Sequence, residues 1–453
     1  MPRADVPWVD DQNVALFTDL YELTMVQAYV EEGLADQAVF SLYVRRLPDE
    51  RNYLLAGGLA GVLRYLENLR FGTQEIYYLA SLGRFSERFL TWLSKFRFTG
   101  AVHAVAEGTA VFANEPILEI TAPIAEAQLV ETMVMNRIHL ETVLASKAAR
   151  VVQAAAGRAV VDFAARRMHG ADAAVSGARA FHIAGVAATS NVLAGRLYGI
   201  PVAGTMAHSY IQAHDDELAA FRTFTGVFRD TILLVDTYDT LAGVAKVCAL
   251  AKELGDNFAV RGIRLDSGDL GALSVASRQL LDDAGLQRVQ IFASGGLDEN
   301  EIARLVASGA PIDAFGVGTD MGVSRDRPAL DIAYKLCEFA DRGRLKLSPG
   351  KPILPGRKQV FRTYRDGVAV GDVIGRASEK QPGTPLLRPM MRKGRTLADA
   401  RPALKDIRAY AEAQKNSLPK ALRALTPADP AYPVAVSETL AAYQAEVARE
   451  VAG

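Results

Sequence analysis

The stretch Val260-Arg-Gly-Ile-Arg-Leu-Asp-Ser-Gly-Asp269 joins an apolar run to a polar turn, and a helical pattern over 270–284 follows directly. A short apolar run bounded by turn residues is typical of a buried strand. The same order, a short apolar run and then a longer helical stretch, recurs from Val160 to Thr319. Repeated strand–helix units predict a parallel sheet covered by helices.

Six such units can be traced along this part of the chain. The expected strands are 160–163, 201–203, 231–235, 260–265, 289–293 and 314–317. The expected helices are 184–198, 210–224, 240–254, 270–284, 298–308 and 329–340. Six units favour a closed or nearly closed barrel, although the sequence alone does not exclude an open, doubly wound sheet.

The flanking segments have different patterns. Residues 1–135 mix helical stretches with strand-like pieces such as 39–44 and 116–120, and 125–155 is expected to be helical. Residues 348–356 are rich in Pro and Gly and are expected to form a loop. Residues 359–374 predict a hairpin turned at Asp366-Gly367, and 397–451 is expected to be largely helical.

Composition limits the class of protein. The chain has 453 residues, half of them hydrophobic, which suits one large domain and a second one. Its 51 Lys and Arg against 52 Asp and Glu argue against a general nucleic-acid binder, which needs a basic surface. Two cysteines outside any CxxC pair fit a reducing compartment. With no signal-peptide pattern and no membrane-spanning run, we expect a cytoplasmic protein.

The residues that follow the predicted strands carry the chemistry, because strand ends meet at the mouth of a barrel, where active sites lie. The residues expected there are Arg166, Arg167, His208, Asp236, Tyr238, Asp239, Arg264, Asp266, Ser267, Asp269, Ser294, Gly295, Gly296, Gly316, Gly318, Thr319 and Asp320. Of the adjacent pair Arg166 and Arg167, we expect one in the site and the other in a structural ion pair. Neighbouring side chains rarely point the same way.

Two glycine turns, Ala293-Ser-Gly-Gly-Leu-Asp298 and Gly316-Val-Gly-Thr-Asp320, follow the last two strands. Glycines allow a phosphate to approach the backbone, where free N–H groups bind it, and barrels often bind phosphate there. We therefore predict a phosphate site.

Two further side chains stand out as candidates. His208 is a possible base, ligand or nucleophile, although a lone histidine is more often structural. Asp266 is a candidate for binding Mg²⁺ or sugar hydroxyls, whereas Asp269 is expected to cap the next helix.

Together the motifs resemble the nicotinate phosphoribosyltransferase family. They are Thr18-Asp-Leu-Tyr-Glu-Leu-Thr-Met25, Phe163 with Arg166-Arg167, Thr189-Ser-Asn191, Gly204-Thr-Met-Ala-His-Ser209, Arg264-Leu-Asp-Ser-Gly-Asp269, Ser294-Gly-Gly296, Gly316-Val-Gly-Thr319 and Leu354-Pro-Gly-Arg-Lys-Gln359. The resemblance implies an irregular α/β barrel of about six to seven strands with the active site, residues 136–347. It also implies a second α+β domain built from 1–135 and a C-terminal segment, 348–453.

The resemblance implies that nicotinate and phosphoribosyl pyrophosphate give nicotinate mononucleotide and pyrophosphate, with coupled ATP hydrolysis and a requirement for Mg²⁺. His208 would be transiently phosphorylated. Our own hypothesis is that Asp266 and Arg264 are catalytic, with Asp266 binding Mg²⁺ largely through substrate phosphates. The implied nicotinate-binding residues are Tyr21, donated across a homodimer interface, Phe163, Arg166 and Ser190. The implied phosphate- and ribose-binding residues are Ser294, Gly295, Gly296, Gly318, Thr319 and Lys358.

Two positions bear on specificity. Ala164 stands where the family pattern leads us to expect glycine, and its methyl group could shift the slot for the base. Ser190 stands where nicotinamide-specific relatives have an aspartate; a hydroxyl can donate to a carboxylate that an aspartate would repel. A nicotinamide phosphoribosyltransferase and a non-catalytic nucleotide-sensing barrel remain the alternatives.

Overall fold

The computed structural model describes residues 9–347 and 353–452, and the chain divides into two compact units. One unit is Leu144–Pro328, and the other combines Met1–Val143 with Ala329–Gly453. Part of the loop predicted at 348–356 lies outside the described residues. Within the described ranges, no helix is long and apolar enough to cross a membrane.

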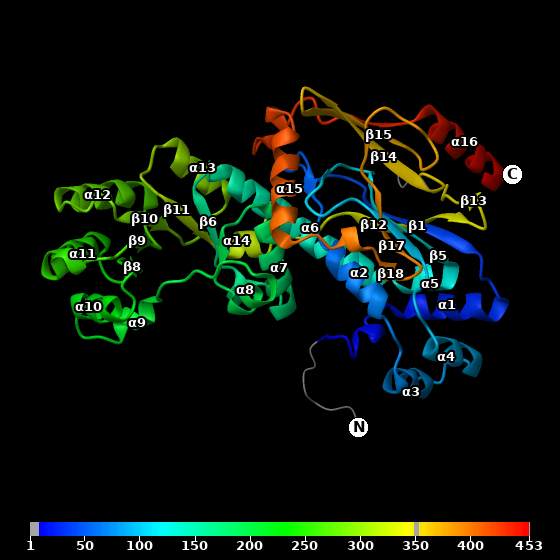
Figure 1. Ribbon diagram of the computed structural model, residues 1–453, viewed down its shortest axis with the longest axis horizontal. Coiled ribbons are helices and arrows are strands. Elements are labelled where there is room, and N and C mark those ends of the chain that lie inside the picture. The colour runs from blue at the N-terminus through cyan, green and yellow to red at the C-terminus, as the bar shows by residue number, and fades with distance from the viewer. Residues whose placement is uncertain (1–8, 348–352, 453) are drawn as a thin grey trace. The chain divides into compact units, whose positions relative to one another are not determined.

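The unit Leu144–Pro328 is built on a parallel sheet with the strand order β7-β6-β11-β10-β9-β8. Its strands are β6 (Ala159–Asp162), β7 (Ala188–Thr189), β8 (Ile232–Leu234), β9 (Gly262–Leu265), β10 (Gln290–Ala293) and β11 (Ala314–Val317). Its helices are α7 (Ala171–Ala184), α8 (Val192–Tyr198), α9 (His208–Gln212), α10 (Glu217–Val227), α11 (Thr240–Leu254), α12 (Leu270–Asp283), α13 (Glu299–Ala307), α14 (Thr319–Gly322) and the 3-10 helix η2 (Ala165–Arg167). Figure 1 shows α10, α11 and α12 along the outer side of β8, β9 and β10. The predicted α/β class with a parallel sheet is confirmed.

Local sequence explains why these units form. The strands carry fully buried apolar side chains, such as Ile263, Ile291 and Phe315, which helices cover on the outside. An aspartate then begins the next helix by accepting a hydrogen bond from a free backbone N–H. Asp269 Oδ1 accepts from Ala272 N at 3.1 Å, which confirms the predicted cap, and Asp239 caps α11 in the same way.

The strand predicted at 201–203 is wrong. Val202 forms a single bridge with Thr189 and is 51% exposed, so this segment is not a buried strand. The strand beside β6 is β7, which lies inside the stretch expected to be helix 184–198. Two residues are too few to show an alternating pattern, so the sequence carries no periodic signal for β7.

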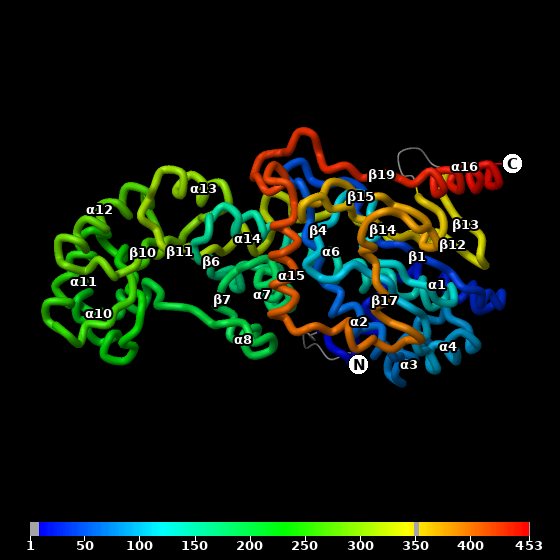
Figure 2. Tube along the Cα trace, turned by 45° about the horizontal axis from the view of Figure 1, so that its top comes forward, coloured from blue at the N-terminus to red at the C-terminus, as the bar shows by residue number. Residues whose placement is uncertain are grey.

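Among the described residues the other unit contains three sheets, and strands from both parts of its chain share one of them. The sheet β13-β12-β1-β5-β3-β17-β18 consists of β13 (Arg342–Gly343), β12 (Ile332–Phe339), β1 (Gln37–Val44), β5 (Pro116–Pro123), β3 (Ala101–Ala104), β17 (Arg388–Arg392) and β18 (Arg395–Thr396). The sheet β16-β14-β15-β19 consists of β16 (Thr384–Pro385), β14 (Lys358–Arg365), β15 (Val368–Arg376) and β19 (Val434–Val436), and β2 (Leu54–Leu55) pairs with β4 (Ala110–Val111). Its helices are α1 (Leu20–Glu32), α2 (Leu59–Asn68), α3 (Thr73–Ser81), α4 (Glu87–Ser94), α5 (Ile124–Leu129), α15 (Leu404–Ser417) and α16 (Glu438–Ala452), and α6 (Glu131–Ala154) crosses the unit border. Figure 2 shows β12 beside β1, although residues 45–331 separate the two strands in sequence.

The helix predicted at 329–340 is also wrong, because this segment forms strand β12. It pairs antiparallel with β1, and the Tyr334 ring stacks on Phe40 with centroids 4.9 Å apart. A mixed apolar run of this length fits both a helix and a strand, so the distant partner decides its structure. The predicted hairpin is confirmed as β14–β15, with positive φ at Asp366 and Gly367 as its two-residue turn requires.

A buried ion pair joins the two strands of this hairpin. The Arg362 guanidinium is fully buried and donates to both carboxylate oxygens of Asp372, from Nη2 to Oδ2 at 2.6 Å and from Nε to Oδ1 at 3.0 Å. Gln414 of α15 accepts from the same guanidinium at 3.1 Å, and Tyr432 donates to Asp372 at 2.7 Å. The network therefore connects α15 and the later residue Tyr432 to the hairpin.

Replacing Arg362 by methionine should lower the free energy of unfolding by about 3–5 kcal/mol, because it leaves a buried carboxylate without its cation. Arg88→Ala is the control, since Arg88 pairs with Glu31 at an exposed site and should matter little. Urea denaturation of both variants measures the difference. Equal stabilities of the two variants would contradict this role for Arg362.

Candidate active site

The ends of four neighbouring strands, β6, β11, β10 and β9, meet around one pocket of about 350 Å³. That volume lies in the range of small-molecule sites. The pocket is lined by Phe163, Arg166, Arg167, Asp266, Ser294, Gly295, Gly296, Leu297, Gly316, Gly318, Thr319, Asp320 and Arg325. Eight of the thirteen residues predicted for the site are in this set: Phe163, Arg166, Asp266, Ser294, Gly295, Gly296, Gly318 and Thr319.

The buried carboxylate of Asp162 holds the turn after β6. Its Oδ1 accepts from Ala164 N at 2.8 Å, and its Oδ2 accepts from Thr189 Oγ1 of β7 at 2.7 Å. Burial raises the pKa of Asp162, and these two hydrogen bonds oppose the rise. Asp162 therefore has a structural role: it fixes the start of η2, which carries the two arginines.

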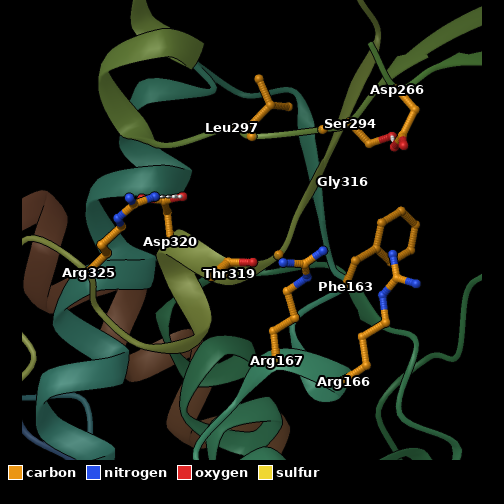
Figure 3. Close-up of a pocket in the computed structure, with 13 residues that line it drawn as sticks. Phe163, Arg166, Arg167, Asp266, Ser294, Leu297, Gly316, Thr319, Asp320 and Arg325 are labelled. Atoms are coloured by element: carbon orange, nitrogen blue, oxygen red, sulfur yellow. Dashed lines mark hydrogen bonds and ion pairs between the residues drawn. The ribbon is translucent and has the colours of Figure 1, made fainter.

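Arg166 and Arg167 both line the pocket, so the expectation that only one of them belongs to the site is wrong. Figure 3 shows both side chains extending from η2 toward the strand ends that carry Ser294 and Asp266. Both side chains are exposed. A 3-10 helix has three residues per turn, so neighbouring side chains do not point to opposite faces as they do in a strand. The pocket thus has two guanidinium groups that can bind carboxylate or phosphate.

Phe163 forms an aromatic wall of the pocket. Its ring packs against Phe292 with centroids 5.8 Å apart, and the Arg264 guanidinium carbon lies 5.8 Å from the ring centroid. Gly316 makes room for the ring, since a Cβ there would lie 2.5 Å from Phe163. A flat apolar face next to cations suits an aromatic anion.

Arg264, Asp266 and Ser294 form a polar group at the ends of β9 and β10. Asp266 Oδ1 accepts from Ser294 Oγ at 2.5 Å, and Arg264 Nη2 lies 3.9 Å from the same carboxylate oxygen. Arg264 Nη1 also donates to Thr205 Oγ1 at 2.8 Å. Burial lowers the pKa of Arg264, and the carboxylates of Asp266 and Asp236 oppose that shift.

His208 is the first residue of α9 and lies beside this group. Its Nε2 is 3.6 Å from Asp266 Oδ2, and its Nδ1 is 3.1 Å from Thr237 Oγ1. The side chain is 38% exposed, so the imidazole remains accessible to a ligand. The structure thus brings His208, Arg264 and Asp266 together, as the sequence predicted.

The sequence placed Asp236 among the residues expected at the mouth but gave it no specific role; its buried Oδ2 accepts from Asp266 N at 2.8 Å and Ser267 Oγ at 2.7 Å. Its position at the end of β8 was the available signal. Sequence reasoning also missed Arg325, which lines the pocket 3.9 Å from Asp320. Arg325 follows the last strand in a stretch without periodic pattern, so no sequence signal marked it.

The remaining predicted site residues are placed differently. Ser190 is half-buried after β7, where its N–H donates to Asp162 O at 2.8 Å, and it is not among the pocket-lining residues. Tyr21 and Lys358 belong to the other unit, where Tyr21 is 47% exposed and Lys358 is buried against Glu119 at 3.1 Å. The roles of all three in binding stay predictions.

Comparison with known proteins gives a consistent result. Three family models match successive parts of the chain: the nicotinate phosphoribosyltransferase N-terminal domain at 16–139, the nicotinate phosphoribosyltransferase family at 158–374 and the nicotinate phosphoribosyltransferase C-terminal domain at 383–444. The nicotinate phosphoribosyltransferase pncB2 of Mycobacterium tuberculosis is 56% identical over 426 residues, 94% of this chain and 92% of that protein. The nicotinate phosphoribosyltransferase of Bacillus subtilis is 43% identical over 360 residues, 78% of this chain and 74% of that protein.

The fold is similar to that of a solved structure. The crystal structure of human nicotinic acid phosphoribosyltransferase matches with a TM-score of 0.84 and 27% identity, covering 95% of this chain and 99% of that one. The similarity thus extends over both units in sequence and in fold. The chain belongs to the nicotinate phosphoribosyltransferase family.

Proposed function

We propose that the protein joins nicotinate to the ribose of phosphoribosyl pyrophosphate and forms nicotinate mononucleotide and pyrophosphate. The observation that carries this proposal is the pocket at the strand ends, where an aromatic ring, two guanidinium groups and a glycine-rich backbone line one space. The family supports it, since the relatives are named for this activity. The same relationship supports describing the six-stranded sheet as part of an irregular α/β barrel.

Nicotinate would bind at the Phe163 end of the pocket. The pyridine ring stacks on Phe163, and the carboxylate pairs with Arg166, which offers the planar donors that a carboxylate prefers. The pyridine nitrogen has a free lone pair, so it needs orientation and no general base. We propose that Tyr21 of the partner subunit covers the other face of the ring in a homodimer; the exposed Tyr21 side chain supports this. Ser190 is proposed to favour a carboxylate over an amide.

The sugar phosphate would bind along the two glycine turns. Gly295 has φ of +90°, and a Cβ there would lie 1.8 Å from Asp266 O, so only glycine fits. Ser294, Gly296, Gly318 and Thr319 line the same side of the pocket. Backbone N–H groups at such turns bind phosphate oxygens. Arg264 is proposed to stabilise the leaving pyrophosphate, together with Lys358.

Mg²⁺ fits this site. The Asp266 carboxylate lines the pocket, and among the described residues Asp236 Oδ1 is buried without a hydrogen-bond partner. The described residues contain no group of three metal-ligating side chains, so Asp266 would hold the ion with oxygens of the substrate phosphates. When bound, Mg²⁺ supplies positive charge next to the leaving pyrophosphate.

The reaction exchanges one bond for another. The pyridine nitrogen forms a bond to C1 of the ribose, and the bond from C1 to the pyrophosphate oxygen breaks. Positive charge develops on the sugar ring and negative charge on the leaving group. The cations of the site stabilise the negative charge on the leaving group. Alignment of the two substrates in one pocket replaces an encounter in solution.

His208 is proposed to couple ATP to this reaction. When Nδ1 carries the proton and donates to Thr237 Oγ1, Nε2 keeps its lone pair. Nε2 takes the γ-phosphoryl group of ATP and ADP leaves; water later releases phosphate and restores the imidazole. The phosphoryl group would add negative charge beside Asp266 and so change the affinity of the pocket for the phosphorylated sugar.

A product assay tests the proposed function. The protein should convert nicotinate and phosphoribosyl pyrophosphate to nicotinate mononucleotide and equimolar pyrophosphate, and ATP should stimulate the rate. Nicotinamide in place of nicotinate should be a poor substrate. Equal use of nicotinamide would favour the nicotinamide enzyme, and failure to release pyrophosphate would favour a non-catalytic nucleotide sensor.

His208→Ala should abolish nicotinate-stimulated ATP hydrolysis and the acid-labile labelling of the protein by ATP carrying a radioactive γ-phosphate. His214→Ala is the matched control, because His214 in the same region bonds the Tyr210 carbonyl and should leave both signals in place. Full ATP coupling in His208→Ala would refute the proposed role.

Gly295→Ala should lower kcat/KM for phosphoribosyl pyrophosphate by about 100-fold or more, since the added Cβ displaces the turn by an ångström or so. Gly309→Ala separates this clash from backbone strain: Gly309 also has positive φ, +74°, but open space around it. Steady-state kinetics of both variants give the comparison. A similar loss in both would show that the close approach to Asp266 has no special role.

A further inference from the structure

The segment around the 3-10 helix η2 packs on α14 at Gly322, where the nearest neighbouring atom is the Ala164 methyl group. Ala164, which precedes η2, is fully buried. A Cβ added to Gly322 of α14 would lie 2.6 Å from Ala164 Cβ and 3.1 Å from Met168 Cγ. The Ala164 side chain therefore packs on the bare backbone of Gly322.

Ala164 is linked directly to the walls of the pocket. Its carbonyl accepts from Arg167 N at 2.8 Å, its N–H is held by Asp162, and the preceding residue is Phe163. Phe163 N in turn donates to Val317 O of β11 at 2.9 Å. A shift of Ala164 away from α14 would move the Phe163 ring and the Arg166 side chain together.

We propose that Gly322 is a positioning residue that acts through Ala164. A second methyl group at Gly322 would overlap the one that Ala164 supplies, so one of the two positions has to be a glycine for the other to carry a methyl group without a shift. The contact between Ala164 and Gly322 thereby determines the distance of Phe163 and Arg166 from Gly318 and Thr319. These two residues lie at the start of α14 and line the pocket. The inference rests on the proposed function in one respect, namely that nicotinate binds at Phe163 and Arg166.

The geometry distinguishes this contact from ordinary glycine packing. Gly322 does not have positive φ, so alanine fits its backbone, and the conflict comes from neighbouring side chains, first of all Ala164 Cβ. Ala164 has no rotamer to turn away, so its backbone must move. At Gly177 a Cβ would meet Met168 Cε at 2.5 Å, but that atom is the end of a flexible side chain that can swing aside.

The test is an exchange of the methyl group between the two positions. Gly322→Ala should lower kcat/KM for nicotinate by about 10- to 100-fold, with a larger rise in KM for nicotinate than for phosphoribosyl pyrophosphate. The double variant Ala164→Gly with Gly322→Ala should recover most of this loss, because only the 3.1 Å contact with Met168 Cγ then remains to relax. Gly177→Ala is the matched control and should keep near-normal kinetics.

Thermal unfolding is measured for every variant. Normal nicotinate kinetics in Gly322→Ala, or no recovery in a folded double variant, overturns the proposal. If Gly322→Ala alone does not fold, a folded and active double variant supports the pairing, and an unfolded one overturns it. If the unmodified protein makes no nicotinate mononucleotide, the proposed function fails. The pairing is then tested separately by comparing the unfolding temperatures of Gly322→Ala and the double variant, which should be higher in the double variant.

Discussion

The parallel register of β9, β10, β11 and β6 is the constraint on which the site depends. Leu265 pairs with Ala293, and Val317 pairs with Asp162, so the chain leaves neighbouring strands at the same level. Parallel strands need a crossover connection, here a helix, which returns the chain to the end of the sheet where the strands begin. Every strand end in this group can therefore contribute to one pocket, although its lining residues extend along the chain from Phe163 to Arg325.

Buried aspartates at the strand ends accept hydrogen bonds from neighbouring turns, and these hydrogen bonds also organise the site. Asp162 closes the β6 turn through hydrogen bonds to Ala164 and Thr189, and Asp236 holds the β9 turn through Asp266 and Ser267. A buried carboxylate without such partners would be costly. The two aspartates thus position the side chains that face the ligand without themselves lining the pocket.

Much of this arrangement could be predicted from the sequence, because strong local signals accompany it. Apolar runs followed by Gly-containing turns predicted β9, β10 and β11, and Asp269 correctly predicted where α12 begins. The failures have two physical causes: a distant pairing partner determined one structure, and the other element is too short to carry a periodic signal. β12 is a strand because β1 pairs with it, and β7 is too short to show a pattern. The packing of Ala164 on Gly322 likewise depends on segments that meet only in the folded chain.

The central claim is that one pocket orders both substrates, with the base at Phe163 and the phosphate at the glycine turns. A crystal structure with nicotinate mononucleotide bound tests it most directly. The account predicts the pyridine ring stacked on Phe163, its carboxylate on Arg166, and the phosphate at Gly295–Gly296 or Gly318–Thr319. A product bound with the ring and phosphate ends reversed, or bound outside this pocket, would contradict the account.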